Sequence, residues 1–104
     1  MDKELIIVRE SLVNKAFTLT YFGGKTKFVY NKDSEEVKEF TEHIAQYRVH
    51  VSDKETGEIV KFFYCINKGV ARYVIDFLVI KGEEPENIGI YDLRKAAIME
   101  IKCM

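Results

Sequence analysis

Residues Phe17 to Tyr30 read FTLTYFGGKTKFVY. Two runs in which apolar and polar residues alternate flank the glycine pair Gly23–Gly24. Such alternation is typical of a strand with one buried face, and glycine reaches the positive φ that a two-residue hairpin loop requires. The sequence therefore predicts a β-hairpin over residues 17–30.

The same alternation predicts a register for this hairpin. With Gly23 and Gly24 as the loop, Tyr21 lies opposite Thr26 and Leu19 lies opposite Phe28. One face then carries the large apolar side chains of Phe17, Leu19, Tyr21, Phe28 and Tyr30. The outward face carries Thr18, Thr20, Phe22, Lys25, Lys27 and Val29. A slip of one residue would exchange the faces of one strand, so we expect this register to be fixed.

A helix is predicted after the hairpin, over residues 35–46. Asp33 or Ser34 can cap its first turn, and Val37, Phe40 and Ile44 recur at helical spacing on one side. Further strands are expected at residues 4–10, 47–51 and 59–66. The last of these is apolar on both faces, which is typical of a central strand.

Two later segments fit more than one structure. Residues 70–81 read VARYVIDFLVIK, and a helix would place Arg72 and Asp76 one turn apart. Branched and aromatic residues dominate, however, and favour a strand, so we expect a meander over residues 47–80. Residues 91–102 predict a helix capped by Asp92, while the alternation of the last residues, IMEIKCM, leaves a closing strand as the alternative.

These elements predict one α+β domain spanning residues 1–104. It would contain an antiparallel sheet of about five strands, with the helices at 35–46 and about 91–102 packed on one face. The start lacks the pattern of a signal peptide, and no apolar run reaches the length of a membrane span. Cys65 and Cys103 are too few for a disulfide framework, so we expect a cytoplasmic protein that does not bind membranes.

The charges of the chain are unevenly spread, although the formal net charge is only −1. Residues 1–32 carry six basic and three acidic side chains, and residues 33–58 carry eight acidic and three basic ones. No basic tail or arginine cluster is present. This distribution argues against a protein that binds nucleic acid mainly through its phosphates.

Metal and cofactor motifs have little support. The candidate ligands, His43, His50, Cys65 and Cys103, form no closely spaced pair, so we expect neither a metal nor a cofactor. Cys65 lies in an apolar strand pattern and is expected to be a core residue rather than a nucleophile.

Two groups of residues are candidates for binding. Thr20, Phe22, Lys25 and Lys27 on the outward hairpin face combine an aromatic ring with lysines, as in sheet surfaces that bind single-stranded nucleic acid. Arg48 and His50, with Lys61 on the next strand, could form a small cationic patch that binds an anion. Both groups are also what an ordinary half-exposed sheet would carry.

Asp76 is the least expected residue, because it interrupts the apolar run VIDFLVI. A buried, unpaired carboxylate has a raised pKa and often marks a functional site. A structural pair with Arg72 is the simpler explanation. The functional explanation would make the chain a small enzyme that uses Asp76, His50 and Arg48.

Taken together, the pattern favours a non-catalytic interaction or regulatory module, either a homodimer or a binder of one protein partner. Not all of its aromatic side chains fit inside a small domain, and interfaces are enriched in such residues. The strand at 47–51 is expected at an exposed sheet edge that a second copy covers. Small proteins of this kind are often accessory factors of viruses or mobile elements. The alternatives are nucleic-acid binding through the outward face of the 17–30 hairpin, and the small enzyme.

Overall fold

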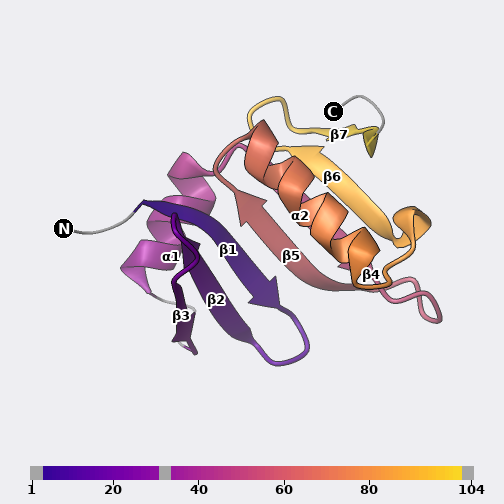
Figure 1. Cartoon of the computed structure of the whole chain (residues 1–104), viewed down its shortest axis with the longest axis horizontal. Helices are drawn as coiled ribbons and strands as arrows, with labels where there is room; N and C mark the ends of the chain where they lie inside the picture. Colours follow the sequence, from indigo (N-terminus) through magenta and orange to yellow (C-terminus); the bar gives the residue numbers. More distant parts are fainter. Residues whose placement is uncertain (1–3, 31–33, 102–104) are drawn as a thin grey trace.

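The computed structural model describes residues 4–30 and 34–101. They form a seven-stranded sheet in the order β3-β2-β1-β5-β4-β6-β7 (Figure 1). Every neighbouring pair is antiparallel. The α+β class and the antiparallel sheet are confirmed, although the sheet has seven strands rather than about five.

The first half of the chain follows the prediction closely. It contains β1 (Leu5–Ser11), β2 (Ala16–Tyr21), β3 (Thr26–Val29) and α1 (Glu35–Glu39). The π-helical segment η1 (Phe40–Ile44) continues α1, and the Ala45 N–H donates to the Phe40 carbonyl at 2.8 Å. The predicted helix over 35–46 is therefore confirmed. Its proposed cap Asp33 lies outside the described residues, and the Ser34 side chain makes no capping hydrogen bond.

The hairpin is confirmed, but its predicted register is wrong by one residue. Thr20 pairs with Thr26, Leu19 with Lys27, and Phe17 with Val29. The loop contains Phe22, Gly23 and Gly24, because the Tyr21 N–H donates to the Lys25 carbonyl at 2.9 Å and the Gly24 N–H donates to the Tyr21 carbonyl at 3.0 Å. Both glycines adopt positive φ, 97° and 85°, which favours glycine at each position. The shift turns Val29 towards the core face and leaves Phe28 62% exposed.

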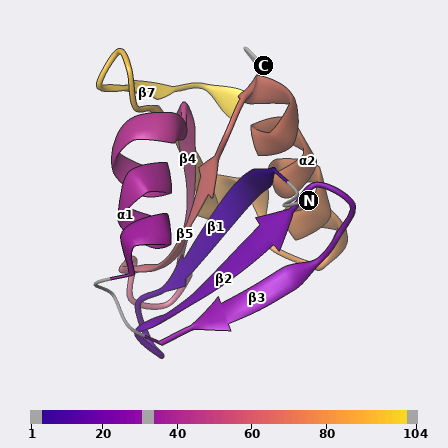
Figure 2. The same ribbon diagram turned by 90° about the vertical axis from the view of Figure 1, so that its left-hand side faces the viewer.

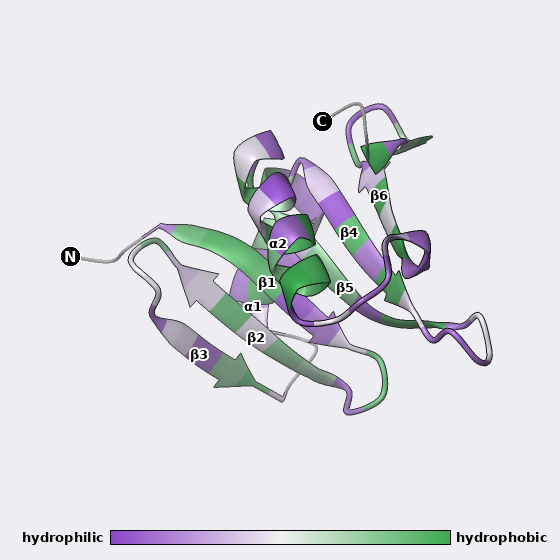
Figure 3. Cartoon of the chain, turned by 45° about the vertical axis from the view of Figure 1, so that its right-hand side comes forward, coloured by the Kyte–Doolittle hydropathy of each residue, from purple (hydrophilic) through white to green (hydrophobic). Residues whose placement is uncertain are grey.

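The strands β4 (Tyr47–Ser52) and β5 (Ile59–Cys65) form the centre of the sheet. The alternation of hydrophobic and hydrophilic residues along β4 is visible in Figure 3. The central position of β5 is confirmed, since it pairs with β1 and β4. The expectation of an exposed edge at 47–51 is wrong, because β4 pairs with β5 on one side and with β6 on the other. The edges of the sheet are β3 and β7.

Residues 70–81 form a helix rather than the expected strand, so the meander ends with β5. Helix α2 (Lys68–Ile80) begins after Asn67, whose side-chain Oδ1 accepts from the Val70 N–H at 2.9 Å. Its buried residues recur at spacings of three and four: Ala71, Val74, Ile75 and Leu78. Burial of this stripe against the sheet outweighs the strand preference of branched residues.

The expected helix over 91–102 is also wrong, and the alternative of a closing strand is what the structure contains. The chain forms β6 (Ile88–Asp92) after the short 3₁₀ helix η2 (Pro85–Asn87), and then β7 (Ala97–Met99). Asp92 Oδ1 accepts from the N–H groups of Arg94 and Lys95, each at 3.0 Å, so this residue caps a turn and not a helix. Ala96 has a φ of 53°, a left-handed conformation that ends this turn. Residue 102 lies outside the described residues.

The two helices lie on opposite faces of the sheet, which corrects the expectation of one face (Figure 2). Alternate residues of each strand belong to two separate cores. The core beneath α1 and η1 contains Val8, Phe17, Leu19, Val37, Phe40 and Ala45. The core beneath α2 contains Ile7, Val49, Val51, Phe63, Cys65, Ala71, Val74, Ile75, Leu78, Ile88 and Ile90. Each helix therefore covers only part of its face: α1 covers the β1–β2 part, and α2 covers the β4–β5 part.

Candidate functional site

Because α1 and α2 cover different halves of opposite faces, each face of the sheet has one part that no described helix covers. On the α1 face, strands β5, β4 and β6 carry Phe62, Arg48, His50 and Tyr91, and none of these belongs to either core as described. We call these four residues the open face. On the α2 face, the β1–β3 strands lie beside α2 and form the floor of a groove, described below as the α2 groove.

Arg48 is at the centre of the open face. Its guanidinium carbon lies 4.7 Å from the ring centroid of Phe62 and 4.9 Å from that of Tyr91. β5 positions Phe62 on one side of the arginine and β6 positions Tyr91 on the other, where it pairs directly with Arg48. Both rings attract the cation through their quadrupoles, so together they stabilise the position of the guanidinium group between them.

Tyr64 connects Arg48 to a carboxylate. Burial and the charge of Glu10 raise the pKa of Tyr64, while the nearby Arg48 partly opposes this effect. Tyr64 pairs with Arg48 across β5 and β4, and its ring also contacts Phe62 at a centroid distance of 6.1 Å. The Nε atom of Arg48 is buried and has no hydrogen-bond partner within the described part of the chain. A buried donor without a partner is rare and costs about 1–3 kcal/mol.

His50 lies next to Arg48 on the same face of β4. Burial, followed by the charge of Arg48, lowers the pKa of His50, so the neutral imidazole is favoured near pH 7. Its ring lies over Gly89 of β6, where a Cβ atom would overlap Nε2 and Cε1 of the imidazole. Glycine at this position therefore allows the histidine ring to lie against the sheet.

The α2 groove has a volume of about 270 Å³ and mixed chemistry. Its floor is formed by side chains from three strands of the first half of the sheet and from β5: Ile7, Arg9, Thr18, Thr20, Thr26 and Phe63. Tyr73, Val74 and Phe77 of α2 form its wall. The rings of Tyr73 and Phe77 are stacked with a centroid distance of 6.5 Å, and they are 64% and 45% exposed. Phe28 lies on the same face, because it pairs with Thr18.

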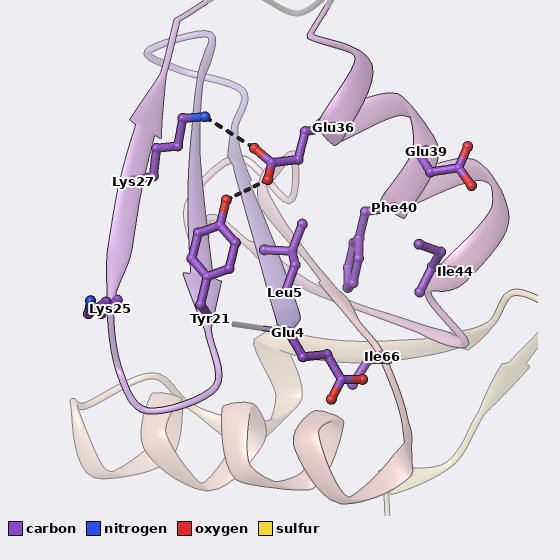
Figure 4. Close-up of a pocket in the computed structure, with 10 residues that line it drawn as sticks. All are labelled: Glu4, Leu5, Tyr21, Lys25, Lys27, Glu36, Glu39, Phe40, Ile44 and Ile66. Atoms are coloured by element: carbon purple, nitrogen blue, oxygen red, sulfur yellow. Dashed lines mark hydrogen bonds and ion pairs between the residues drawn. The ribbon is translucent and has the colours of Figure 1, made fainter. Parts of the chain in front are cut away.

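A separate cavity, of about 640 Å³, lies between the β2–β3 hairpin and α1 (Figure 4). The carboxylate of Glu36 is central to it and accepts from the Tyr21 hydroxyl at 2.6 Å and from Lys27 Nζ at 3.2 Å. Leu5, Phe40, Ile44 and Ile66 supply its apolar walls, and Glu4, Lys25 and Glu39 also line it. Since both oxygens of Glu36 already have protein donors, these contacts attach the hairpin to α1.

The structure separates most of the residues that the sequence suggested for binding. Thr20 lies in the α2 groove, Phe22 is exposed in the hairpin loop, and Lys25 and Lys27 line the cavity on the other side of the sheet. Arg48 and His50 share the open face, as expected. Lys61 does not join them, because it pairs with Val51, whose side chain lies in the α2 core. Asp76 is exposed on α2, far in the fold from the α1 face that carries Arg48.

The open face was only partly visible in the sequence. The sequence predicts a helix at Tyr91, and it gives Phe62 no role beyond its place in the apolar strand at 59–66. The available signal was the alternation in residues 59–66 and 47–51, which places Phe62, Arg48 and His50 on matching sides once the two strands are paired.

The described residues offer little for a metal site or a reactive thiol. These residues contain no group of three or more His, Cys, Asp or Glu side chains that could hold a metal ion. Cys65 is fully buried in the core, as expected, and this burial raises the pKa of its thiol to about 12, which keeps it protonated. Among residues 4–30 and 34–101, no helix is both long and apolar enough to cross a membrane.

Comparison with known proteins found no relative of this chain. No protein-family model, no curated protein and no solved structure matches the chain.

Proposed function

We propose that this chain is a non-catalytic interaction module that pairs with a second copy of itself through the α2 groove. The observation that carries the proposal is the exposure of three aromatic rings on one side of the sheet, those of Phe28, Tyr73 and Phe77. Exposed aromatic residues that cluster around a groove are typical of interaction surfaces. A reducing, cytoplasmic setting is part of the proposal and is supported by the free, buried thiol of Cys65.

A second copy suits this surface for two reasons. The exposed side of α2 carries large apolar side chains, among them Tyr73 at 64% and Ile80 at 82% exposure, so in a two-fold dimer each α2 would cover the β1–β3 part of its partner's sheet. The charges are also complementary, because Arg9 lies on the groove floor and Asp76 lies on the exposed side of α2. A two-fold axis would bring each Arg9 towards the Asp76 of the other copy.

Sedimentation equilibrium tests the proposal. We expect a dimer at micromolar concentration, and the double variant Tyr73→Ser/Phe77→Ser should weaken it at least about tenfold, as loss of two central aromatic residues commonly does. Ile98→Ser is the matched control, because Ile98 is 78% exposed on β7, away from the groove. A monomer at high concentration, or equal weakening by the control, would reject the proposal.

A charge-exchange experiment tests the orientation of the dimer. Arg9→Asp and Asp76→Arg should each weaken association, and the chain with both changes should recover most of it. Failure of the double variant to recover would exclude this pairing of the two copies.

The two alternatives from the sequence have weaker support. Nucleic-acid binding by the hairpin needs Thr20, Phe22 and the two lysines on one face, whereas Lys27 bonds to Glu36 on the α1 side, Thr20 lies in the α2 groove and Phe22 lies in the loop. The enzyme hypothesis needs Asp76 near His50 and Arg48, and these residues lie on opposite sides of the sheet. Salt-dependent binding of a labelled single strand would favour the first alternative over self-association.

A further inference from the structure

The open face holds a cation that has no acidic partner in the described part of the chain. Arg48 contacts two rings and Tyr64, and no described carboxylate lies within ion-pair distance of it. Glu10 lies on β1, on the other side of β5 from Arg48, and its charge acts on Tyr64. A half-buried arginine without a counter-ion is unusual, because charged groups removed from water are normally paired.

The geometry also determines from which direction a partner can reach this cation. Phe62 of β5 and Tyr91 of β6 both lie close to the guanidinium carbon, from the two strands that flank β4, so a partner would have to reach the N–H donors between the two rings. Because the two rings already restrain the Arg48 guanidinium group, it loses little conformational freedom when it binds a planar anion through two parallel hydrogen bonds. Among the described residues, the helices pack elsewhere: α1 and η1 share a core with β1 and β2, and α2 lies on the other face.

The charges around Arg48 favour a monoanion. The neighbouring His50 has a lowered pKa and is neutral near pH 7, and Glu10 lies on the far side of Tyr64. One fixed positive charge with a carboxylate nearby matches a single carboxylate better than a phosphate dianion. Beyond Tyr91, the side chain of Ile98 is 78% exposed on the same face and offers an apolar contact.

We propose that the open face binds an acidic segment of a protein partner, with one carboxylate on Arg48 and a neighbouring apolar side chain on Tyr91 and Ile98. This site lies on the opposite face from the α2 groove and does not depend on self-association. The ligand is recognised by its chemistry, an extended chain in which acidic and apolar residues alternate.

The test is a titration of the ¹⁵N-labelled protein with a short capped peptide in which glutamate and phenylalanine alternate. We expect chemical-shift changes in β4, β6 and β7, and binding at least about tenfold weaker for a peptide with glutamine in place of glutamate, since bonds to charged groups contribute that much. Arg48→Met keeps the aliphatic stem between the two rings and should weaken binding to the same extent. Arg94→Met, in the exposed β6–β7 turn, is the matched control and should leave binding unchanged.

Several outcomes would overturn the inference. These are equal binding of the glutamine peptide, equal weakening by Arg94→Met, shifts confined to the α2 groove, or absence of binding at millimolar peptide. Displacement of the peptide by inorganic phosphate or by a single-stranded oligonucleotide would instead assign the site to phosphate groups. If Arg48→Met disturbs the fold, the comparison of the two peptides on the unmodified protein still decides the question.

Discussion

The register of the β2–β3 hairpin leads to a specific prediction about stability, because it moves Phe28 away from the core face while Leu19 stays buried. Leu19 is fully buried, whereas Phe28 is 62% exposed. Leu19→Ala should therefore lower the free energy of unfolding by about 2–5 kcal/mol, the usual cost of removing a buried leucine side chain. Phe28→Ala should lower it by less than about 1 kcal/mol, because most of this ring remains in water when the chain folds.

Urea unfolding followed by circular dichroism measures both values. In the register with Phe28 opposite Leu19, Phe28 would be a core residue and its replacement would cost about 3–5 kcal/mol. A loss for Phe28→Ala that equals or exceeds the loss for Leu19→Ala would therefore refute the observed register. The measurement should be repeated at a tenfold higher protein concentration, because Phe28 adjoins the proposed dimer surface and its contribution there would grow with concentration.

Three further predictions concern the open face and the α1 contact. Gly89→Ala should lower the free energy of unfolding by about 1–3 kcal/mol, because its Cβ overlaps the His50 ring, and calorimetry at pH 7 measures this. The lowered pKa of His50 means that the unfolded chain binds the proton first, so stability should fall as the pH drops from about 7 to about 5.5. This fall should be smaller for His50→Gln, and an unchanged slope would contradict the assignment. Tyr21→Phe removes the 2.6 Å bond to Glu36 and should cost about 1–2 kcal/mol in urea unfolding, with Tyr30→Phe, on an exposed ring, as the neutral control.

Sequence reasoning succeeded where the pattern of one segment was sufficient. The hairpin, the helix at 35–46, and the strands at 4–10, 47–51 and 59–66 all follow from local alternation and helical spacing. The one-residue error in the hairpin arose because KTKFVY supports two registers, one that buries Phe28 and Tyr30 and one that buries Val29. β3 is an edge strand, so exposing its aromatic residues costs less there than in the centre of the sheet.

The errors in the second half had a tertiary cause. Residues 70–81 contain enough branched side chains to resemble a strand, and only packing against β4 and β5 shows that the stripe of Ala71, Val74, Ile75 and Leu78 is the meaningful pattern. Asp92 is a turn residue in the structure, although the same residue type can cap a helix. The side of the sheet on which a helix packs depends on its connections, which a single sequence does not contain.

The same reasoning explains why the candidate site was only half predictable. Arg48 and His50 were visible as an alternating pair on one strand, but their aromatic neighbours come from β5 and β6. The second of these strands joins the site only because α2 carries the chain across the sheet from β5 to the far side of β4. A site assembled by such a crossover has no signature in the spacing of its residues.

The position of the two surfaces has a consequence for how they would work together. The α2 groove is built mainly on β1, β2 and β3, and the open face is built on β5, β4 and β6, with β1 and β5 as the junction. Because the surfaces face opposite sides of the sheet and share no side chain, an acidic segment on Arg48 would not compete with a second copy at Tyr73. Peptide binding on the open face would change the affinity of the dimer only if it altered the strands that join the two surfaces. These are β1 and β5, which pair at Glu10 and Phe62. We therefore expect a dimer that carries two acidic segments, one for each copy, with a dimer dissociation constant that the peptide leaves unchanged.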